Sequence, residues 1–346
     1  MNLISVFLSS FALCVPLVIL ARVVALRLGV VDNPRSGRAS QAPRPYLGGV
    51  AIGLAVCISA TVAWIRTDTL AASMVAVLVA VAVSGLIGLS DDLVTHSAKP
   101  KLLAEFGVAT LVVLLGGTLA ITEVPLIDAA FSLLAIVLLT NSFNLLDNSD
   151  GALASVAVIT GLGITGVAYS LNRLPESYLA MAVAGACLAF LLFNWHPASI
   201  FMGDAGSLFV GCALVCSLAL LKGTDTPRSI PVALGLMLVP LADTALVFVA
   251  RRLEKRRFMD GGVDHLHHRL GRTSLGVRGG AAILAAVSAT GCSIAVMVTT
   301  DVLDWLPALI LLSLLAGTLL IIGLRLPSHA APNGKTSMDG ITASEI

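Results

Sequence analysis

Long apolar stretches separated by short polar ones repeat along most of the chain. A helix needs roughly 17–25 consecutive apolar residues to cross the hydrocarbon core of a bilayer. The stretches that meet this length are 3–21, 47–65, 70–90, 102–121, 125–143, 152–171, 178–194, 205–222, 229–250, 280–300 and 303–324. The pattern predicts an all-α fold, that of a polytopic integral membrane protein with about 11 transmembrane helices.

Composition excludes a soluble globular domain. Hydrophobic residues make up 57% of the chain and charged residues only 12%, with a mean hydropathy of +0.97. A soluble protein of this composition would expose too much apolar surface to water. We expect one transmembrane domain over residues 1–324. Residues 325–346 are polar and contain Pro and Gly, so a disordered tail is expected there.

The basic residues indicate the orientation, because cytoplasmic loops near membrane spans carry an excess of Lys and Arg. If the N-terminus lies outside, all but four of the 21 Lys and Arg residues fall in inward-facing segments; the four are Arg66, Arg173, Lys222 and Arg228. No basic residue precedes the first apolar stretch, so an uncleaved span is expected there and not a removable signal peptide. The tail is then cytoplasmic.

The polar residues gather in the loops that this orientation places in the cytoplasm. The densest cluster is NSFNLLDNSDG, residues 141–151, at the end of the fifth apolar stretch. Asn141, Asn144, Asp147 and Asp150 are spaced by three, so on a helix they would form a curved polar stripe. Helix capping and turn formation explain one or two such side chains, but not four at a regular spacing. We therefore interpret the stripe as the lining of a cytoplasmic cleft.

An acidic pair, Asp91–Asp92, ends the third apolar stretch. Two adjacent carboxylates repel each other unless a cation is close, and Lys99 and Lys101 follow within ten residues. The pair could be an ordinary charged pair at the membrane interface. It could also act as a base beside lysines that bind phosphate.

The stretch FMGDAGS, residues 201–207, has the composition of a site for an anion and a metal. Gly203 and Gly206 permit tight turns and close approach of a ligand, and the N-terminus of the following helix favours anions. Asp204 offers a hard oxygen ligand, although it could simply cap that helix. Mg²⁺ takes one or two protein carboxylates and completes its shell with water and substrate phosphates. Asp204 with a second oxygen from residues 141–151 would meet that requirement.

Three histidines and one acid inside an apolar stretch complete the candidates. His265, His267 and His268 could form a zinc site, but zinc usually needs four protein ligands or three plus water, and no Cys lies in this loop. Beside the arginines of residues 251–272, we interpret them as donors to phosphate or sugar oxygens, with a structural role as the alternative. Asp243 is an ionisable residue inside the membrane and therefore a functional candidate, either in catalysis or in holding a ligand or a neighbouring helix.

In this order, the motifs resemble those of the polyprenyl-phosphate N-acetylhexosamine-1-phosphate transferases, a membrane superfamily that includes phospho-N-acetylmuramoyl-pentapeptide translocase. The resemblance covers about residues 30–272. The matching motifs are Asp91–Asp92 with Lys101, the NxxNxxD of Asn141, Asn144 and Asp147, NxxPAxxFMGDxGS at 194–207, and HLHHRL.

The resemblance implies transfer of a sugar 1-phosphate, with N-acetylhexosamine 1-phosphate as the expected group, from a UDP-sugar to polyprenyl phosphate, releasing UMP. It implies that Asn144 and Asp204 bind Mg²⁺, with Mn²⁺ as an alternative, and that Asp91 and Asp92 are the catalytic pair handling the acceptor phosphate. The residues implied to contact substrates are Lys101, Asp147, Asp150, Asn194, His265, His267, His268 and Arg269.

The same resemblance implies a place and partners. The expected location is the plasma (inner) membrane of a bacterium, in the synthesis of cell-envelope polysaccharide. The expected partners are the UDP-sugar, the polyprenyl phosphate and the lipid bilayer, with no nucleic acid; a homodimer is left open.

The chain departs from the family pattern at three places. Asn148 stands where the family often has Gly, and Ala152 where it often has Leu. In the first loop, the family's basic-His element reads Gly37–Arg38–Ala39–Ser40, which bears on sugar or acceptor recognition and not on the metal centre. HLHH is closer to the branch acting on UDP-N-acetylhexosamines than to the muramoyl-pentapeptide branch.

Two other functions fit parts of the sequence. A transporter would place ionisable groups near the bilayer midplane, in broken helices related by repeats, whereas the acids here cluster at one surface and no inverted repeat is visible. A catalytically silent relative that binds a UDP-sugar is the second alternative, suggested by the changes at Ser40 and Asn148.

Overall fold

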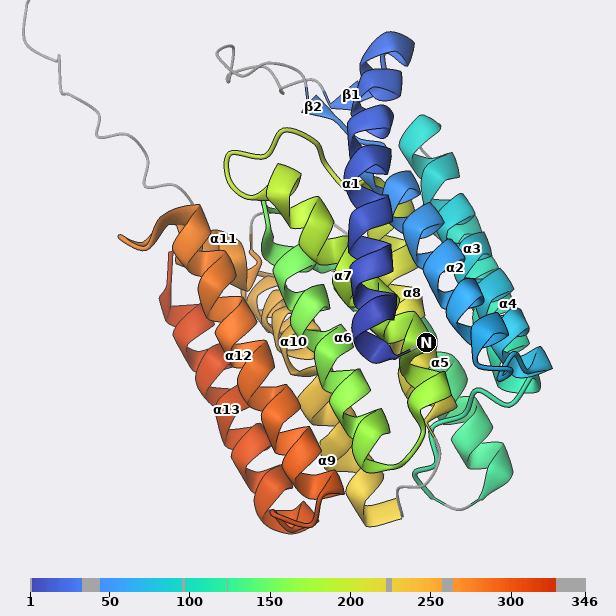
Figure 1. The fold of residues 1–346 in the computed structure, drawn as a ribbon. Helices are drawn as coiled ribbons and strands as arrows, with labels where there is room; N and C mark the ends of the chain where they lie inside the picture. The colour runs from blue at the N-terminus through green and yellow to red at the C-terminus, as the bar shows by residue number, and fades with distance from the viewer. Residues whose placement is uncertain are drawn as a thin grey trace, which may run out of the picture.

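The computed structural model describes residues 2–32, 44–94, 97–122, 124–221, 226–256 and 264–327. They form a bundle in which most helices run side by side along one direction (Figure 1). The helices are α1 Leu3–Leu28, α2 Gly48–Arg66, α3 Ala72–Leu93, α4 Ala98–Leu114, α5 Pro125–Leu146, α6 Ala152–Ser170, α7 Tyr178–Asn194, α8 Gly203–Leu220, α9 Thr226–Leu236, α10 Leu238–Leu253, α11 Leu266–Gly271, α12 Gly276–Thr299 and α13 Trp305–Arg325, with the 3-10 helix η1 Leu174–Ser177 before α7. Within these ranges the only strands are β1 Val31–Asp32 and β2 Arg44–Pro45, which pair antiparallel. The all-α prediction is confirmed.

Local sequence explains how α1 begins and ends. The side-chain oxygen of Asn2 accepts the N–H of Ser5 at 2.8 Å, and Gly29 ends the helix in the left-handed conformation at φ 71°. A polar acceptor at the start and a glycine at the end satisfy backbone groups that the helix itself leaves unpaired. Between these two signals the residues are almost all apolar, so the helix is suited to lipid.

The outer helices present apolar side chains to their surroundings. Over their most apolar windows, α1 and α13 are only 22% buried, and Leu8, Ile19 and Leu314 are among the exposed side chains. The corresponding window of α8 is 89% buried, because α8 packs against α2, α3, α5, α6 and α7. An exposed apolar surface of this extent is stable in lipid and not in water. The protein is therefore a multi-pass membrane protein with α8 at its centre.

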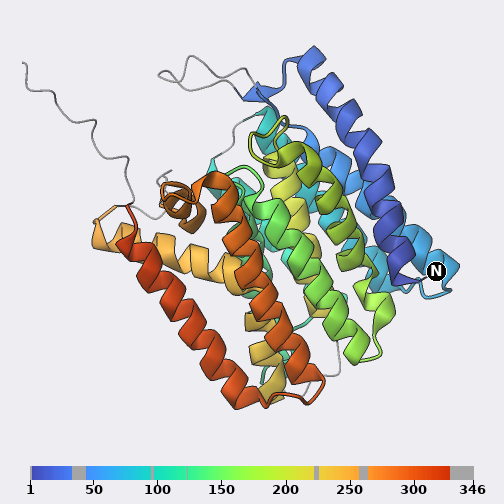
Figure 2. The same cartoon turned by 60° about the vertical axis from the view of Figure 1, so that its left-hand side comes forward.

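The number of spans differs from the simple pattern. In the described ranges nine helices are long and apolar enough to cross a membrane, or up to ten if α9 and α10, bent by 76°, count as one span. The sequence predicts a single helix over 229–250, but Pro240 lacks the N–H that a continuous helix would donate to Leu236. The predicted span 102–121 is helical only to Leu114. As a result of the bend, α10 crosses the direction of its neighbours (Figure 2).

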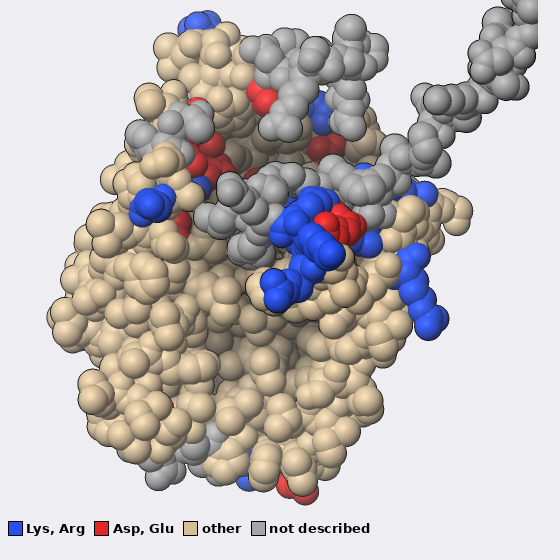
Figure 3. Space-filling model, turned by 180° about the vertical axis from the view of Figure 1, so that it is seen from behind, with Lys and Arg blue, Asp and Glu red and all other residues tan. Residues whose placement is uncertain are grey.

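Charged side chains gather at one end of the bundle. Figure 3 shows them concentrated in its upper part, with few on the surface below. This end carries the C-terminal ends of α3 and α5 and the first turns of α4, α6 and α8 (Figure 1), which are the segments where the sequence places the candidate chemistry. That this end faces the cytoplasm, with the N-terminus outside, stays a prediction from the basic residues.

Candidate active site

The first turn of α8 is held by Asp92. The two carboxylate oxygens of Asp92 accept the backbone N–H groups of Asp204 and Ala205 at 2.8 and 2.9 Å. A carboxylate at this place satisfies backbone donors that the helix leaves unpaired and interacts favourably with the helix dipole. The residue that caps α8 is therefore Asp92, from α3, and the alternative that Asp204 serves only as the cap is wrong.

Glycines let the backbones of three helices meet at this turn. A Cβ atom on Gly88 of α3 would lie 2.1 Å from the carbonyl oxygen of Asp204, and one on Gly49 of α2 would lie 2.1 Å from the amide nitrogen of Gly206. Gly203 has φ +73°, and a Cβ there would lie 2.6 Å from an oxygen of Asp92. The position of Asp204 is therefore fixed by backbone packing as well as by hydrogen bonds.

Asp204 is the centre of a polar cluster drawn from four helices. Lys101 of α4 forms ion pairs with Asp204 and, at 3.0 Å, with Asp91 of α3. The side-chain nitrogen of Asn144, from α5, donates to Asp204 at 3.1 Å and to the hydroxyl of Ser207 at 2.8 Å. Three motifs that lie up to 113 residues apart in the sequence thus meet around one carboxylate.

Glu105 is a member of this region that the sequence interpretation does not single out. It lies one turn after Lys101 on α4, is 4% exposed, and accepts a hydrogen bond from the side-chain nitrogen of Asn141. Its other carboxylate oxygen has no hydrogen-bond partner among the described residues. The signal was available, because Glu105 is an acid within the predicted span 102–121, and the rule that selects Asp243 applies to it equally.

The regular stripe of residues 141–151 is only partly helical. Asn141 and Asn144 lie on α5, but the helix ends at Leu146, so Asp147 follows it directly and Asp150 lies in the next turn. Burial raises the pKa of Asp147 well above its ordinary value, and the carboxylates of Asp204, Asp92 and Asp150 raise it further.

Asp150 joins separate loops at this end of the bundle. Its carboxylate lies 3.4 Å from the guanidinium of Arg44 and 2.7 Å from Nδ1 of His196, and it accepts the backbone N–H of Ala198 at 3.0 Å. Arg44 in turn lies over the ring of Phe201, 5.3 Å from its centroid. A direct contact of Asp150 with substrate stays a prediction.

Asn194 also connects two backbone segments. Its side-chain oxygen accepts the N–H of Gly151 at 2.9 Å, and its nitrogen donates to the carbonyl of Ile200 at 3.0 Å. The residue is 4% exposed. These two hydrogen bonds connect the start of α6 to the loop before α8. A direct contact of Asn194 with substrate stays a prediction.

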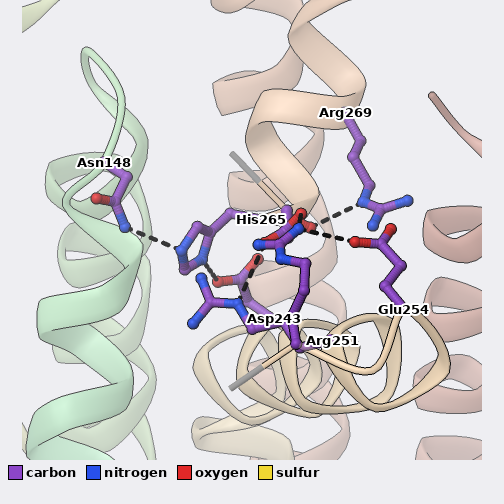
Figure 4. A network of polar contacts seen from close by, with 8 residues as sticks. Asn148, Asp243, Arg251, Glu254, His265 and Arg269 are labelled. Carbon is purple, nitrogen blue, oxygen red and sulfur yellow. Dashed lines mark hydrogen bonds and ion pairs between the residues drawn. The ribbon is translucent and has the colours of Figure 1, made fainter. Parts of the chain in front are cut away.

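The three histidines have different surroundings. Nδ1 of His265 is hydrogen-bonded to Asp243 of α10 at 2.8 Å, and its other ring nitrogen, Nε2, lies 3.3 Å from the side-chain nitrogen of Asn148 (Figure 4). His267 is 3% exposed, and burial lowers its pKa to about 3, so its ring is neutral. His268 is partly exposed, with its ring centroid 4.3 Å from that of His267. Only His268 therefore presents its ring at a surface.

The side chain of Arg269 is hydrogen-bonded to backbone carbonyl groups. Its guanidinium donates to the carbonyls of Asp264, Gly323 and Leu326 at 2.8 to 3.0 Å, and the residue is 3% exposed. The side chain of Asp264 pairs with Arg251 at 3.1 Å. These contacts fasten α11 to the end of α13, whereas the resemblance implies that Arg269 contacts a substrate.

The donor set around Asp204 fits Mg²⁺. In the described ranges no three His, Cys, Asp or Glu side chains converge to hold a metal on their own. Mg²⁺ needs only one or two carboxylates, with water and substrate phosphates as its other ligands. The ammonium group of Lys101 sits between the carboxylates of Asp91 and Asp204, so a cation is already accommodated there. The side chain of Asn144 turns its nitrogen toward Asp204, so a rotation of the amide group is what would present its oxygen, the atom that Mg²⁺ binds.

These features define a class: a polytopic membrane protein with an acidic, lysine-containing centre at one end of its bundle. Residues 74–222 match the model of glycosyl transferase family 4. The chain is 34% identical over 257 residues, 71% of either chain, to a Bacillus subtilis protein named probable undecaprenyl-phosphate N-acetylglucosaminyl 1-phosphate transferase. It is 31% identical over 285 residues, 72% of this chain and 70% of the relative, to decaprenyl-phosphate N-acetylglucosaminephosphotransferase of Mycobacterium tuberculosis.

A third relative belongs to the muramoyl-pentapeptide branch. The phospho-N-acetylmuramoyl-pentapeptide-transferase of Moorella thermoacetica is 32% identical over 260 residues, 69% of this chain and 80% of the relative. The chain belongs to glycosyl transferase family 4, and the resemblance drawn from its motifs is confirmed.

The departures from the family pattern fall in different places. Asn148 is described and makes hydrogen bonds of its own, to the carbonyl of Leu145 and to His265. Ala152 is the first residue of α6 and is buried. The first-loop element that ends in Ser40 lies outside the described residues, and so do residues 328–346 of the expected tail.

Proposed function

We propose that the protein transfers a sugar 1-phosphate, N-acetylhexosamine 1-phosphate, from a UDP-sugar to polyprenyl phosphate, producing a polyprenyl-pyrophosphoryl sugar and UMP. The observation that carries the proposal is the convergence of Asp91, Lys101, Asn144 and Asp204 at one end of a membrane bundle. The names of the relatives point to the same reaction class.

The contacts suit phosphoryl transfer, which needs positioning and charge neutralisation more than covalent chemistry from the protein. In the proposed reaction an oxygen of the acceptor phosphate bonds to the phosphorus that carries the sugar, and the bond from that phosphorus to UMP breaks. Lys101, which pairs with Asp91 and Asp204 in the structure, would contact the phosphates, and the carboxylate of Asp91 would take a proton from the acceptor phosphate. Asp92 acts on the backbone, since it holds the turn that carries Asp204.

Mg²⁺ is part of the proposal. Asp204 and Asn144 would hold it, and when bound it would neutralise charge on the pyrophosphate oxygens. Asp204→Asn is expected to keep the fold and to abolish metal-dependent turnover. Asp301→Asn, the same change at an exposed residue on the opposite end of the bundle, serves as the matched control.

The lipid acceptor explains why the chemistry lies in a membrane protein. The cluster sits at an end of helices whose apolar faces contact lipid, so the phosphate of a polyprenyl chain embedded in the bilayer reaches it without leaving the membrane surface. UDP-sugars are cytoplasmic, which agrees with the predicted orientation. We therefore place the protein in the plasma membrane of a bacterium, in cell-envelope polysaccharide synthesis.

The test is UMP release by detergent-purified protein supplied with a polyprenyl phosphate, Mg²⁺ and, in parallel, several UDP-sugars. Release with one sugar that requires both the metal and the lipid supports the proposal and identifies the donor. A folded protein that binds a UDP-sugar but releases no UMP under any of these conditions would contradict it and favour the silent binder.

A further inference from the structure

Hydrogen bonds connect a chain of three side chains, Asp243, His265 and Asn148, that have no part in the reaction proposed above. Asp243 follows the break between α9 and α10 and is completely buried, and His265 is 2% exposed. Asn148 lies in the turn after α5, next to Asp147. Figure 4 shows His265 between the other two.

The hydrogen bonds of Asp243 determine which nitrogen of His265 carries its proton. One oxygen of Asp243 accepts the N–H of Leu266 at 2.6 Å, and the other lies 2.8 Å from Nδ1 of His265. An ionised carboxylate can only accept, so Nδ1 of His265 is the donor. In a neutral imidazole the second nitrogen, Nε2, is then an acceptor.

Asn148 is arranged to complement that tautomer. Its side-chain nitrogen lies 3.3 Å from Nε2 of His265 and also donates to the carbonyl of Leu145. An amide group has two N–H donors, so both contacts are satisfied together and both require the nitrogen to face inward. Figure 4 shows the amide oxygen of Asn148 pointing away from His265, which leaves it able to accept a hydrogen bond from a ligand.

We propose that Asp243 is a positioning residue that fixes the tautomer of His265 and, through it, the orientation of Asn148, whose amide oxygen accepts an N–H or O–H group of the nucleotide sugar. The proposal rests on the proposed function for the identity of that ligand. Asn148 is also a departure from the family pattern, so the proposed contact is a property of this chain.

Asp243→Asn tests the direction of the hydrogen bonds with almost no change in volume. If the new amide nitrogen faces His265, it donates to Nδ1 and forces the proton onto Nε2, which then meets the N–H of Asn148. If the amide is turned round, its nitrogen meets the N–H of Leu266 instead. Either way two donors face each other, and leaving a buried donor unpaired costs roughly five- to a hundredfold in an equilibrium.

Asn148→Asp supplies the compensating change. In the double variant, the amide introduced at position 243 donates to Nδ1, and Nε2–H donates to the carboxylate introduced at position 148. Each donor again has an acceptor, while the carbonyl of Leu145 loses the donor that Asn148 supplied. We expect Asp243→Asn alone to raise KM for the UDP-sugar about tenfold or more, with a smaller effect on kcat. The double variant is expected to regain part of that loss, because the contact with Leu145 is not restored, and Asp301→Asn to behave as wild type.

The tautomer itself is read from the ¹⁵N signals of histidine-labelled protein, with His265→Gln used to assign the resonances. We expect a protonated Nδ1 on His265 in the wild type and a protonated Nε2 in the double variant. Unchanged nitrogen signals in both variants, or a double variant with a KM no better than that of Asp243→Asn, would overturn the proposal.

Two additional experiments test the proposal if Asp243→Asn does not fold or if the wild type is inactive. If Asp243→Asn does not fold, Asn148→Ala tests the chain from its exposed end, and an unchanged dissociation constant for the UDP-sugar in that variant overturns the proposal. If wild-type protein releases no UMP, the proposed function fails, while the nitrogen signals and calorimetric binding of the UDP-sugar still decide the role of Asp243.

Discussion

Replacing Gly88 by alanine tests whether the backbone contact between α3 and α8 sets the geometry of the site. The added Cβ would lie 2.1 Å from the carbonyl oxygen and 2.3 Å from the carbonyl carbon of Asp204, and Cβ atoms essentially never approach closer than 3.0 Å. Both neighbours are backbone atoms, so no side chain can turn away. The helices must separate by about 0.9 Å, and Asp204 moves with α8.

Stability and activity are expected to respond differently. Overpacking costs about 1–3 kcal/mol, and the better helix propensity of alanine returns up to about 1 kcal/mol. The protein therefore still folds. A displacement of about 1 Å in a reacting group costs on the order of 100-fold in rate, so kcat/KM for UMP release should fall about that much.

The assay compares UMP release and the melting temperature in detergent for Gly88→Ala and Gly107→Ala. Gly107 lies on α4 with nothing within 4 Å of an added Cβ, so its substitution should leave activity unchanged. Activity of Gly88→Ala within about threefold of wild type, in protein of normal stability, would refute the argument that this contact positions Asp204.

Three other substitutions separate structural from functional roles. Arg269→Gln should lower the melting temperature, since charged hydrogen bonds contribute about 1.5–3 kcal/mol each, with kcat/KM of the folded protein near wild type; a raised KM at unchanged stability would instead support a substrate contact. Asn194→Ala should lower both stability and kcat, because it frees the loop before α8, and an effect on KM alone would count against this. Asp147→Asn, measured without metal, should raise the melting temperature at pH 7.5 more than at pH 5. The raised pKa of Asp147 makes the wild type lose stability as the pH rises above about 4, so an equal gain at both pH values would contradict the reasoning.

Much of the helical architecture can be predicted from the sequence because the bilayer requires long apolar segments. The break after α9 is harder to predict, since Pro240 lies inside an apolar stretch that satisfies the length rule without it. The end of α4 could have been predicted, because Gly116 and Gly117 follow it and Gly116 has φ 92°, a conformation in which glycine commonly ends helices; the length rule alone does not use that signal.

For the candidate site, too, the sequence predicts which residues take part but not which groups they contact. The types and order of Asp91, Lys101, Asn144 and Asp204 indicate that these residues belong to one site, and the structure brings them together. Which group each side chain contacts depends on how closely the helices approach. Local sequence cannot reveal that Asp92 binds the turn that carries Asp204.

The segment HLHH, residues 265–268, is the clearest case in which the sequence does not reveal the contacts of its side chains. HLHH predicts three similar side chains facing substrate, yet His265 pairs with an acid of α10 and His267 is buried. The partners come from elements far away in the sequence, so no spacing within the motif distinguishes these roles.

The burial of α8 has a consequence for how the protein responds to its membrane. A helix in contact with lipid must match its apolar length to the bilayer, and it tilts when the thickness changes. The most apolar window of α8 is 89% buried, whereas those of α1 and α13 are 22% buried. Hydrophobic mismatch is therefore absorbed by the peripheral helices, and Asp204, at the start of α8, keeps its depth in membranes of different thickness.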